Sequence, residues 1–325
     1  MKNVSGNKRI KVCTVGTGKH MNEILVPCLR LLNEIELQVA CSKSMDHAVA
    51  FAERWGYIRC SDDWRECLKS PDVDAIVVSG PPKLHYEVLE AAIKAGKSAF
   101  VEKPVVSTLA DLNTLIKLAS TSRSTIQVGY NLRYAPAVQV VNQVLAQNSK
   151  IDCVHINYFA NKPRVNLWGL DNICLSACLA IGVHPLNLAT HLLGPVQSIL
   201  NTNVEINGDD LDICVDMLHT RGRISKVRFN NMAHKFEIGL EGYSNDQLAL
   251  KLNNLRSVLA IKENGTDEIF RYSELRGGFE YNGYIPQLKT FFSDVVDLSK
   301  TDRQLDLDNS HWMYELFERL KPVHR

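Results

Sequence analysis

The chain has 325 residues, of which 45% are hydrophobic and 22% are charged. This length suits two domains, and the composition is that of a globular rather than a disordered protein. Lysine and arginine total 37 against 36 aspartate and glutamate, which leaves a net charge of +1. The near-balance argues against a nucleic-acid partner, because nucleic-acid binders usually carry a basic stripe.

No apolar run in the sequence approaches the ~20 residues that span a bilayer. Residues 1–9 are polar and basic, and the apolar stretch after them is short. We therefore expect no signal peptide, no membrane partner and a cytoplasmic location.

The nine cysteines are scattered and odd in number, and several fall in expected strands or helices. This pattern favours buried thiols in a reducing compartment over a disulfide framework. Cys174 and Cys178 are one helical turn apart, but no second pair stands at zinc spacing. They are therefore predicted to be core residues, and no metal site is predicted.

The elements expected in the first 128 residues alternate between strand and helix. The strands are residues 10–15, 37–41, 74–79, 98–101 and 125–128, and the helices are residues 21–32, 45–55, 84–95 and 109–119. The strand at 74–79 is almost continuously apolar, which indicates burial on both faces, as in a parallel sheet. Repeated strand–helix units with short connections predict an α/β, doubly wound Rossmann domain over residues 1–129.

After Gly129 the chain changes to mostly strands. A helix at 135–146 is followed by strands at 153–159, 198–206, 213–219, 225–230, 236–243, 247–252, 258–262 and 268–272, then by helices at 284–298 and 310–320. Turn signals such as Asn207-Gly208 separate the strands. We predict a second, α+β domain over residues 130–325 with a large, mostly antiparallel open sheet. Whether the last helix packs back on the first domain stays open.

A glycine-rich turn follows the first strand and opens the first helix. It reads Gly16-Thr17-Gly18-Lys19-His20-Met21. The first glycine permits a tight turn, and the second lets the backbone approach a pyrophosphate at the helix N-terminus. Met21 stands where the usual fingerprint has a third glycine. An ordinary strand–helix turn is the alternative, but the position near the N-terminus favours a dinucleotide site.

The residues after the second strand bear on the choice of cofactor. An NAD-specific site usually has a carboxylate there, bonded to the ribose 2′-hydroxyl. This chain has Ser42, Lys43 and Ser44 instead. Hydroxyl groups and an ammonium attract a 2′-phosphate, so NADP is favoured and NAD stays possible. The alternative is that Lys43 is a solvated surface charge.

Several segments together resemble the glucose–fructose oxidoreductase/inositol dehydrogenase (Gfo/Idh/MocA) family. They are Gly16 to Gly18, Ser79-Gly-Pro-Pro82 with His85, Val101-Glu-Lys-Pro104, Gly129-Tyr-Asn-Leu-Arg133-Tyr, and Gly182-Val-His184 with the run that ends at Gly194. The resemblance implies an N-terminal Rossmann domain and hydride exchange with sugars, cyclitols or related small molecules. It also implies a homo-oligomer, a dimer or tetramer, formed through the open sheet of the second domain.

Lys103 is predicted at the carboxyl end of a parallel strand, where ligands bind in such sheets. The resemblance places it beside the nicotinamide and the reacting oxygen, where an ammonium can stabilise developing alkoxide charge. The alternative is a surface lysine in a turn. We expect Glu102 to meet the cofactor ribose or a nearby helix, and Pro104 to fix the turn with the cis bond that the resemblance implies.

The cofactor is also expected to border Gly80, Pro81, Pro82 and His85. The alternative for His85 is an ordinary residue at a helix N-terminus.

His184 is the predicted proton carrier, because imidazole titrates near ~6.5. Pro185 disfavours helical geometry at His184, so we expect a helix start or a kink there. The alternative is a structural histidine. Many family members carry Asp where this chain has Ala180, and that Asp would orient the imidazole. Tyr284 or a water could replace it, the substrate could need less help, or the chain could bind cofactor without turnover.

The predicted substrate-contacting residues come from four segments. They are Tyr130, Asn131, Arg133, Asn187 and Tyr284. Arg133 could hold a carboxylate, phosphate or sugar hydroxyl, or form a structural salt bridge. His191 lies on one helical stripe with His184 and Asn187 and is predicted to be structural.

Three functions stay open at this point. The first is an NADP-linked reductase or dehydrogenase, with Lys103 and His184 as the working pair, acting on a carbonyl, a hydroxyl or an imine-type carbon. The second is a non-catalytic nucleotide-binding regulator. The third is a redox-neutral enzyme that uses bound cofactor transiently.

Overall fold

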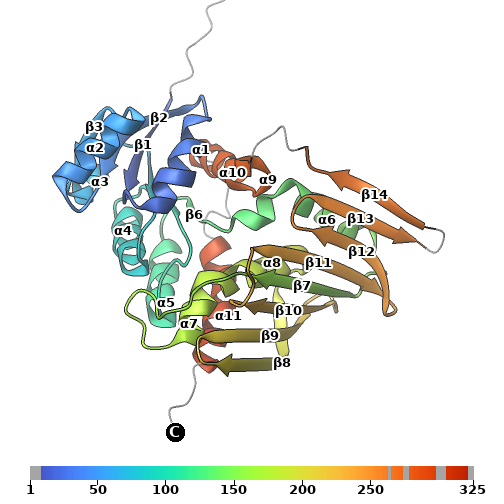
Figure 1. Cartoon of the computed structure of the whole chain (residues 1–325). Coiled ribbons are helices and arrows are strands. Elements are labelled where there is room, and N and C mark those ends of the chain that lie inside the picture. The colour runs from blue at the N-terminus through green and yellow to red at the C-terminus, as the bar shows by residue number, and fades with distance from the viewer. Residues whose placement is uncertain (1–8, 263–264, 274–277, 298–304, 321–325) are drawn as a thin grey trace, which may run out of the picture. The chain divides into compact units, whose positions relative to one another are not determined.

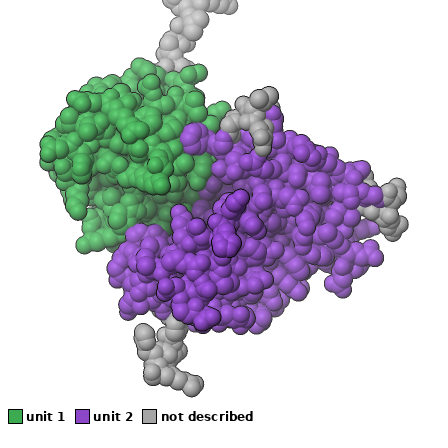
Figure 2. Space-filling model, in the orientation of Figure 1, with its two compact units in different colours: residues 1–129, 284–308 green, residues 130–283, 309–325 purple. Residues whose placement is uncertain are grey.

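The computed structural model describes residues 9–262, 265–273, 278–297 and 305–320. The chain divides into two compact units, coloured green and purple in Figure 2. Unit 1 comprises Met1–Gly129 and Tyr284–Asp308, and unit 2 comprises Tyr130–Gly283 and Asn309–Arg325. A single cut after Gly129 therefore does not describe the chain, because Tyr284–Asp308 returns to unit 1.

Unit 1 is built on a six-stranded parallel sheet in the order β3-β2-β1-β4-β5-β6. Figure 1 labels β1, β2, β3 and β6 of this sheet. Its strands are β1 (Ile10–Val15), β2 (Ile35–Cys41), β3 (Arg59–Ser61), β4 (Ala75–Val78), β5 (Ser98–Val101) and β6 (Ile126–Val128). The order reverses between β1 and β4, which is the point where doubly wound sheets bind dinucleotides. The predicted Rossmann fold is confirmed.

Helices connect these strands. They are the π-type turn η1 (Met21–Leu25) with α1 (Val26–Arg30), α2 (Met45–Trp55), α3 (Trp64–Lys69), α4 (Pro82–Lys94) and α5 (Leu109–Ala119). The returning segment adds α10 (Tyr284–Val296) to the unit. All four residues of β4 are buried, as its continuous apolar sequence predicts. β3 and α3 were not expected from the sequence.

The returning segment covers the edge strand β6. The Gln127 side chain donates to the carbonyl of Gln287 (2.9 Å), and the Val128 amide donates to the Asp306 carboxylate (2.9 Å). The ring of Phe291 meets Phe100 of β5 edge-on at 5.9 Å between centroids. The bond from Val128 satisfies a backbone amide at the strand edge, and the three contacts together hold the returning segment against unit 1.

Unit 2 contains an eight-stranded sheet in the order β14-β13-β12-β11-β7-β10-β9-β8. The strands are β7 (Cys153–Phe159), β8 (Val196–Asn207), β9 (Asp210–His219), β10 (Ile224–Asn230), β11 (Glu237–Ser244), β12 (Gln247–Asn253), β13 (Ser257–Lys262) and β14 (Gly265–Arg271). Every pairing is antiparallel except that of β7 with β10. The mostly antiparallel sheet predicted for the second half is confirmed.

Alternate residues of β7 are buried, so one face of this sheet belongs to the core. The helical elements of the second half are η2 (Asn131–Tyr134), α6 (Pro136–Gln147), α7 (Ile173–Ala177), the π-type turn η3 (Cys178–Gly182), α8 (Val183–Leu193), α9 (Gly278–Tyr281) and α11 (Leu305–Arg319). α8 packs on β7 and β10, and α6 packs on β12 and β13. The first four residues of α11 belong to unit 1.

The elements α7, η3 and α8 form one apolar helical stretch, Ile173–Leu193. Its 21 residues and mean hydropathy of 1.6 would allow it to cross a membrane, so the expectation that no apolar run reaches this length is wrong. It is the only such helix among the described residues, and 89% of its most apolar window is buried inside the protein. A helix that is apolar all round is what a core position requires.

Candidate active site

The glycine-rich turn lies between β1 and η1, where the strand order of the unit 1 sheet reverses. Gly16 has φ +95°, and a Cβ there would lie 2.1 Å from the Ser79 carbonyl oxygen, so only glycine fits. The Gly16 amide donates to the carbonyl of Cys41 (3.0 Å). A Cβ on Gly18 would meet nothing within 4 Å. The turn is thus tightly held on one side and open beside Gly18, as phosphate binding requires.

Met21 was predicted to contact the cofactor, but the structure places its side chain elsewhere. Its side chain is fully buried and packs into the core of unit 1. The bulky residue in place of the third glycine therefore fills space under the helix, and only its backbone could face a cofactor.

The chain after β2 offers hydroxyl groups and one ammonium. The Ser42 hydroxyl lies 3.1 Å from that of Thr17 in the glycine-rich turn. Lys43 is exposed, and Ser44 is the N-cap residue of α2 without a side-chain cap hydrogen bond. These residues present donors beside the phosphate turn, and no carboxylate occupies positions 42–44.

Glu102 is a buried carboxylate directly after β5. It is 5% exposed, accepts the Lys103 amide (3.2 Å) and lies 3.1 Å from the His20 imidazole. A Cβ on Gly129 would lie 2.8 Å from its oxygen, so glycine is needed beside it. Burial alone would raise the pKa of Glu102, but His20 and then Lys103 bring that pKa below its ordinary value. The carboxylate thus places the Lys103 backbone at the carboxyl edge of the sheet.

The peptide bond between Lys103 and Pro104 is cis, which confirms what the resemblance implied. His85 holds the turn from the other side. The Gly80 amide donates to His85 Nε2 (2.9 Å), so Nδ1 carries the proton that is donated to the Pro104 carbonyl (2.8 Å). Burial lowers the pKa of His85 to about 4, so this imidazole is neutral near neutral pH.

The segment that was expected to border the cofactor is therefore divided. Gly80 and Pro81 are exposed, whereas Pro82 is buried at the first turn of α4 and His85 is 1% exposed. His85 does not reach the surface of unit 1, so its predicted contact with the cofactor is wrong. Its two ring nitrogens instead hydrogen-bond to the β4–α4 turn and to the Lys103–Pro104 turn, and so hold these two turns together.

Tyr284 begins α10 and lies in unit 1. It had been expected in the second domain. Its ring meets the His20 imidazole edge-on at 5.9 Å. His20, which the sequence reasoning treated only as part of the phosphate turn, thus contacts both Glu102 and Tyr284. Together with Lys103, these residues gather at one end of the parallel sheet.

In unit 2, His184 is the second residue of α8 and is 8% exposed. Its ring stacks on Tyr158 of β7 at 5.5 Å and 17°, and Tyr158 in turn meets Phe236. A helix start or a kink was expected at His184. α8 begins one residue before His184, but it continues from the helical elements α7 and η3, so His184 does not begin the helical stretch. The π-type turn η3 ends at Gly182, shortly before Pro185, and such turns accommodate irregular hydrogen bonding.

Gly182 lets this helix approach the sheet. A Cβ there would lie 2.7 Å from the ring of Phe229. Asn187 is 5% exposed, one turn beyond His184, while His191 and Ala180 are half-buried. No carboxylate stands one turn before His184, so the orienting group that the resemblance implies is missing at that position.

The segment after β6 begins unit 2. Tyr130 is 1% exposed, and its hydroxyl lies 2.8 Å from that of Ser310, so the predicted substrate contact is wrong and Tyr130 is a core residue. The Asn131 amide donates to the carbonyl of Asn282 (2.7 Å). The Arg133 guanidinium lies 4.9 Å from the ring centre of Tyr134, a cation–π contact.

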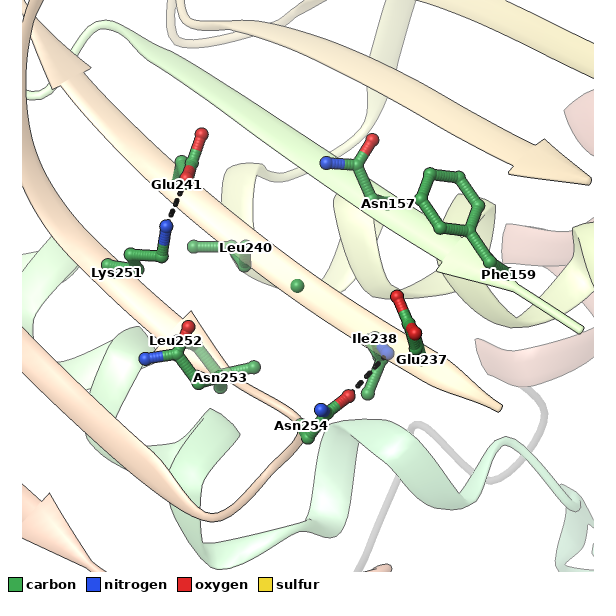
Figure 3. Close-up of a pocket in the computed structure, with 11 residues that line it drawn as sticks. Asn157, Phe159, Glu237, Ile238, Leu240, Glu241, Lys251, Leu252, Asn253 and Asn254 are labelled. Atoms are coloured by element: carbon green, nitrogen blue, oxygen red, sulfur yellow. Dashed lines mark hydrogen bonds and ion pairs between the residues drawn. The ribbon is translucent and has the colours of Figure 1, made fainter. Parts of the chain in front are cut away.

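The sequence reasoning missed a hollow of about 220 Å³ on the sheet of unit 2 (Figure 3). It lies over β7, β11 and β12, and Glu241 and Lys251 form an ion pair (2.8 Å) at its border. None of the predicted site residues lines it. Strand residues with ordinary alternation carry no motif, so no sequence signal could have found it.

Comparison with known proteins agrees with this architecture. Residues 10–130 match the model GFO_IDH_MocA, described as an oxidoreductase family with an NAD-binding Rossmann fold. A solved dehydrogenase from Chromobacterium violaceum has a TM-score of 0.86 at 27% identity, with 96% of this chain and 94% of that chain covered. A solved levoglucosan dehydrogenase in complex with NADH and L-sorbose has a TM-score of 0.80 at 16% identity, covering 96% and 95%.

One curated relative is dTDP-3,4-didehydro-2,6-dideoxy-alpha-D-glucose 3-reductase of Saccharopolyspora spinosa. It is 25% identical over 218 residues, which cover 65% of this chain and 64% of the relative. This chain spans about half the length of other curated relatives that it matches, with 57%, 45% and 54% covered.

The depressed pKa of His85 makes stability depend on pH. The unfolded imidazole takes up a proton near 6.5 but the folded one only near 4, so stability falls as the pH drops through this window. From about pH 7 to about pH 5 we expect His85 to account for a loss of about 2 kcal/mol in the free energy of unfolding. Urea unfolding of the wild type and of His85→Gln at both pH values measures it.

The His85→Gln variant should have a lower free energy of unfolding than the wild type at neutral pH. That free energy should fall less than in the wild type when the pH is lowered. His47→Gln, on the exposed face of α2, is the control and should keep the wild-type slope. Equal slopes in the wild type and His85→Gln would show that His85 is not the titrating group.

Proposed function

We propose that this chain is a nicotinamide-dependent oxidoreductase of the Gfo/Idh/MocA family, whose NAD-binding Rossmann model matches residues 10–130. It transfers a hydride between the nicotinamide and a carbonyl or hydroxyl carbon of a small sugar-like or cyclitol-like metabolite. The observation that carries this proposal is the buried Glu102 carboxylate, which fixes the Lys103 backbone at the carboxyl edge of the sheet. The names of the relatives, a nucleotide-sugar reductase and a levoglucosan dehydrogenase, support the substrate class.

The glycine-rich turn would hold the pyrophosphate, and the bound nicotinamide would supply or accept the hydride. The role proposed for the Lys103 ammonium is to donate a hydrogen bond to the reacting oxygen. Negative charge grows on that oxygen as a carbonyl accepts hydride, so the ammonium binds the transition state more strongly than the ground state. His20, Glu102 and His85 act only by positioning the turn that carries Lys103.

Replacing Lys103 by alanine should lower the rate of hydride transfer by ~10²-fold or more, because the charge on the reacting oxygen loses its partner. The dissociation constant of the cofactor should change by less than about tenfold. Single-turnover absorbance at the nicotinamide band measures the first quantity, and cofactor fluorescence titration measures the second.

Lys117→Ala, an exposed change on α5, is the matched control and should leave both quantities unchanged. An unaltered rate in Lys103→Ala would remove the role assigned to Lys103.

His184 is proposed to move the proton. Carbonyl reduction requires a proton on oxygen as hydride reaches carbon, and alcohol oxidation requires the reverse. The Tyr158 ring stacked beneath the imidazole fixes its plane, which is a task that a carboxylate at position 180 would otherwise share. Aromatic stacking orients the ring without adding charge beside it.

The His184→Asn variant should transfer hydride slowly and show a flattened pH dependence of the hydride-transfer rate, since the proposed proton carrier is gone. The pH profile of single-turnover hydride transfer measures this. His191→Asn, two turns further along the same helix, should keep the wild-type profile. If His184→Asn also keeps that profile, another group moves the proton.

For the cofactor, we propose a preference for NADP. Support comes from Ser42, Lys43 and Ser44 at the N-terminus of α2, where donors and a positive charge suit a 2′-phosphate. NAD stays the alternative cofactor, and the solved relative named above holds NADH.

Lys43→Ala should weaken NADPH binding about tenfold, the value of one charge-assisted contact, and leave NADH binding unchanged. Fluorescence titration with both nucleotides measures the ratio, and Lys117→Ala is again the control. Equal losses for the two nucleotides would contradict a 2′-phosphate contact.

Ala180 favours a second candidate function. Without the family carboxylate, the chain could act on an imine-type substrate, which needs less proton transfer, or bind NAD(P) as a regulator without turnover. Single-turnover hydride transfer with sugar, cyclitol and imine panels separates these cases. Transfer to any panel member excludes the regulator, and transfer to imines alone supports the first alternative.

We further propose a cytoplasmic homo-oligomer that forms through the sheet of unit 2, with no nucleic-acid or membrane partner. β8 is an edge strand whose exposed side chains include Leu200 (52%) and Ile206 (44%). Apolar residues on a strand edge favour pairing with another chain. The nine free cysteines suit a reducing compartment.

Leu200→Asp together with Ile206→Asp should lower the assembled mass, because burying two carboxylates at an interface is costly. Sedimentation velocity measures the mass. Leu31→Asp, 61% exposed in unit 1, is the control and should leave it unchanged. A wild type that sediments as a monomer would contradict the proposal.

A further inference from the structure

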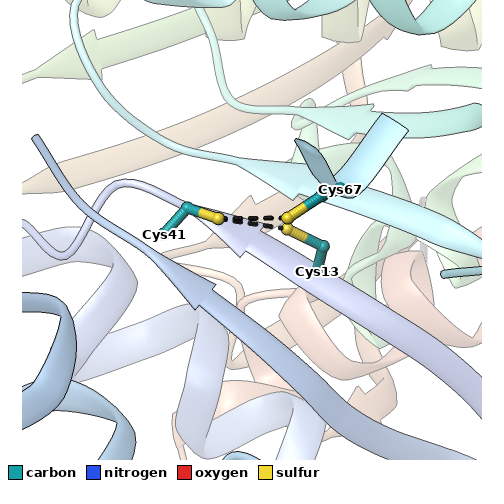
Figure 4. Close-up of side chains that lie close together, drawn as sticks. All are labelled: Cys13, Cys41 and Cys67. Atoms are coloured by element: carbon teal, nitrogen blue, oxygen red, sulfur yellow. Dashed lines mark hydrogen bonds between the residues drawn. The ribbon is translucent and has the colours of Figure 1, made fainter. Parts of the chain in front are cut away.

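Three cysteine thiols from separate elements meet inside unit 1 (Figure 4). They are Cys13 of β1, Cys41 at the end of β2, and Cys67 of α3. The sulfur of Cys41 lies 3.6 Å from that of Cys13 and 3.2 Å from that of Cys67, and all three sulfurs fall within 4.8 Å of one another. All three side chains are buried, at most 3% exposed.

The spacing of these sulfurs is close to that of a shared metal ion. With metal–sulfur bonds of ~2.3 Å, three thiolates around one ion stand about 3.8–4.0 Å apart. The separation between Cys13 and Cys41, 3.6 Å, is shorter than this by about 0.2–0.4 Å, and that between Cys41 and Cys67, 3.2 Å, by about 0.6–0.8 Å. The side chains must therefore rotate slightly apart to receive an ion.

We propose that Cys13, Cys41 and Cys67 form a three-thiolate site for a divalent d10 metal ion of the zinc class. Thiolate sulfur is the soft donor that selects such ions. Each thiol that binds loses its proton to the solvent, and no electron is transferred. The product has three thiolate charges against two on the ion, a net charge of −1.

The surroundings provide access to the ion and a counter-charge. A small pocket of about 90 Å³ reaches Cys67 from the surface and is also lined by Arg59, Cys60 and Glu66. It is an entry path and leaves space for a fourth ligand such as water, which completes the tetrahedral shell that zinc prefers. The Arg59 guanidinium lies near enough to favour negative charge at Cys67.

Metal binding at this cluster should release protons, because each thiol must lose its proton before its sulfur binds the ion. The affinity for the metal should therefore strengthen as the pH rises.

The site is linked to the phosphate turn through Cys41. The carbonyl of Cys41 accepts the Gly16 amide, and the next residue, Ser42, contacts Thr17. An ion that fixes the end of β2 therefore also fixes the base of the glycine-rich turn. This role is independent of whether the chain transfers hydride.

The direct test uses the full chain, reduced and stripped of metal, and kept under anaerobic conditions. Titration with Cd²⁺ should produce a sulfur-to-metal charge-transfer band that saturates at one ion per chain. X-ray absorption of the Zn²⁺-loaded protein should show about three sulfur neighbours at ~2.3 Å. Failure to saturate at one ion, or fewer than two sulfur neighbours, would overturn the proposal.

Variants locate the site. Cys67→Ser should weaken Cd²⁺ binding by at least ~10-fold, because one of three soft ligands is lost. Cys28→Ser replaces a buried thiol of the same unit outside the cluster and should bind as the wild type does. Unchanged affinity in Cys67→Ser, or an equal loss in Cys28→Ser, would overturn the assignment.

Thermal unfolding adds a readout that requires no variant. Zn²⁺ should raise the Tm of the wild type, because an ion that binds only the folded chain stabilises it. A Tm that does not move at saturating Zn²⁺ would also count against the site.

Discussion

The burial of one carboxylate, Glu102, constrains the whole carboxyl edge of the unit 1 sheet. Removing a charged group from water costs several kcal/mol unless hydrogen bonds and opposite charge replace the lost hydration. The Glu102 carboxylate accepts a hydrogen bond from the Lys103 amide and contacts the His20 imidazole. These two interactions fix the turn after β5 relative to the phosphate turn after β1. Gly129 must lack a side chain for the carboxylate to fit. One buried charge thus sets the geometry of three connections that are far apart in sequence.

The fold could be predicted where burial leaves a regular pattern. β4 is buried on both faces and β7 on one, and the apolar residues show this directly. β3 and α3 are short and polar at several positions. Their sequences therefore show neither the alternation of a strand nor the apolar spacing of a helix. The stretch Ile173–Leu193 is apolar all round and holds Pro185, and an element without an amphipathic pattern gives no helical period.

The candidate site could be predicted where backbone geometry demands a residue type. Gly16 is such a case, because its φ and its contact with Ser79 exclude any side chain. The roles of His85 and Tyr130 could not be predicted, because a motif does not reveal whether a side chain points outward or into the core. The cysteine cluster is invisible in sequence for a related reason: Cys13, Cys41 and Cys67 come together only through the order of the strands.

We propose that the Lys103 ammonium holds the reacting oxygen of the substrate beside the bound nicotinamide. A crystal structure of the full chain with bound NADP⁺ tests this role most directly. We expect the ammonium to lie within hydrogen-bond reach of the space over the reactive carbon of the ring, directly or through one bridging water. A ring bound with the Lys103 ammonium beyond that reach would contradict this role.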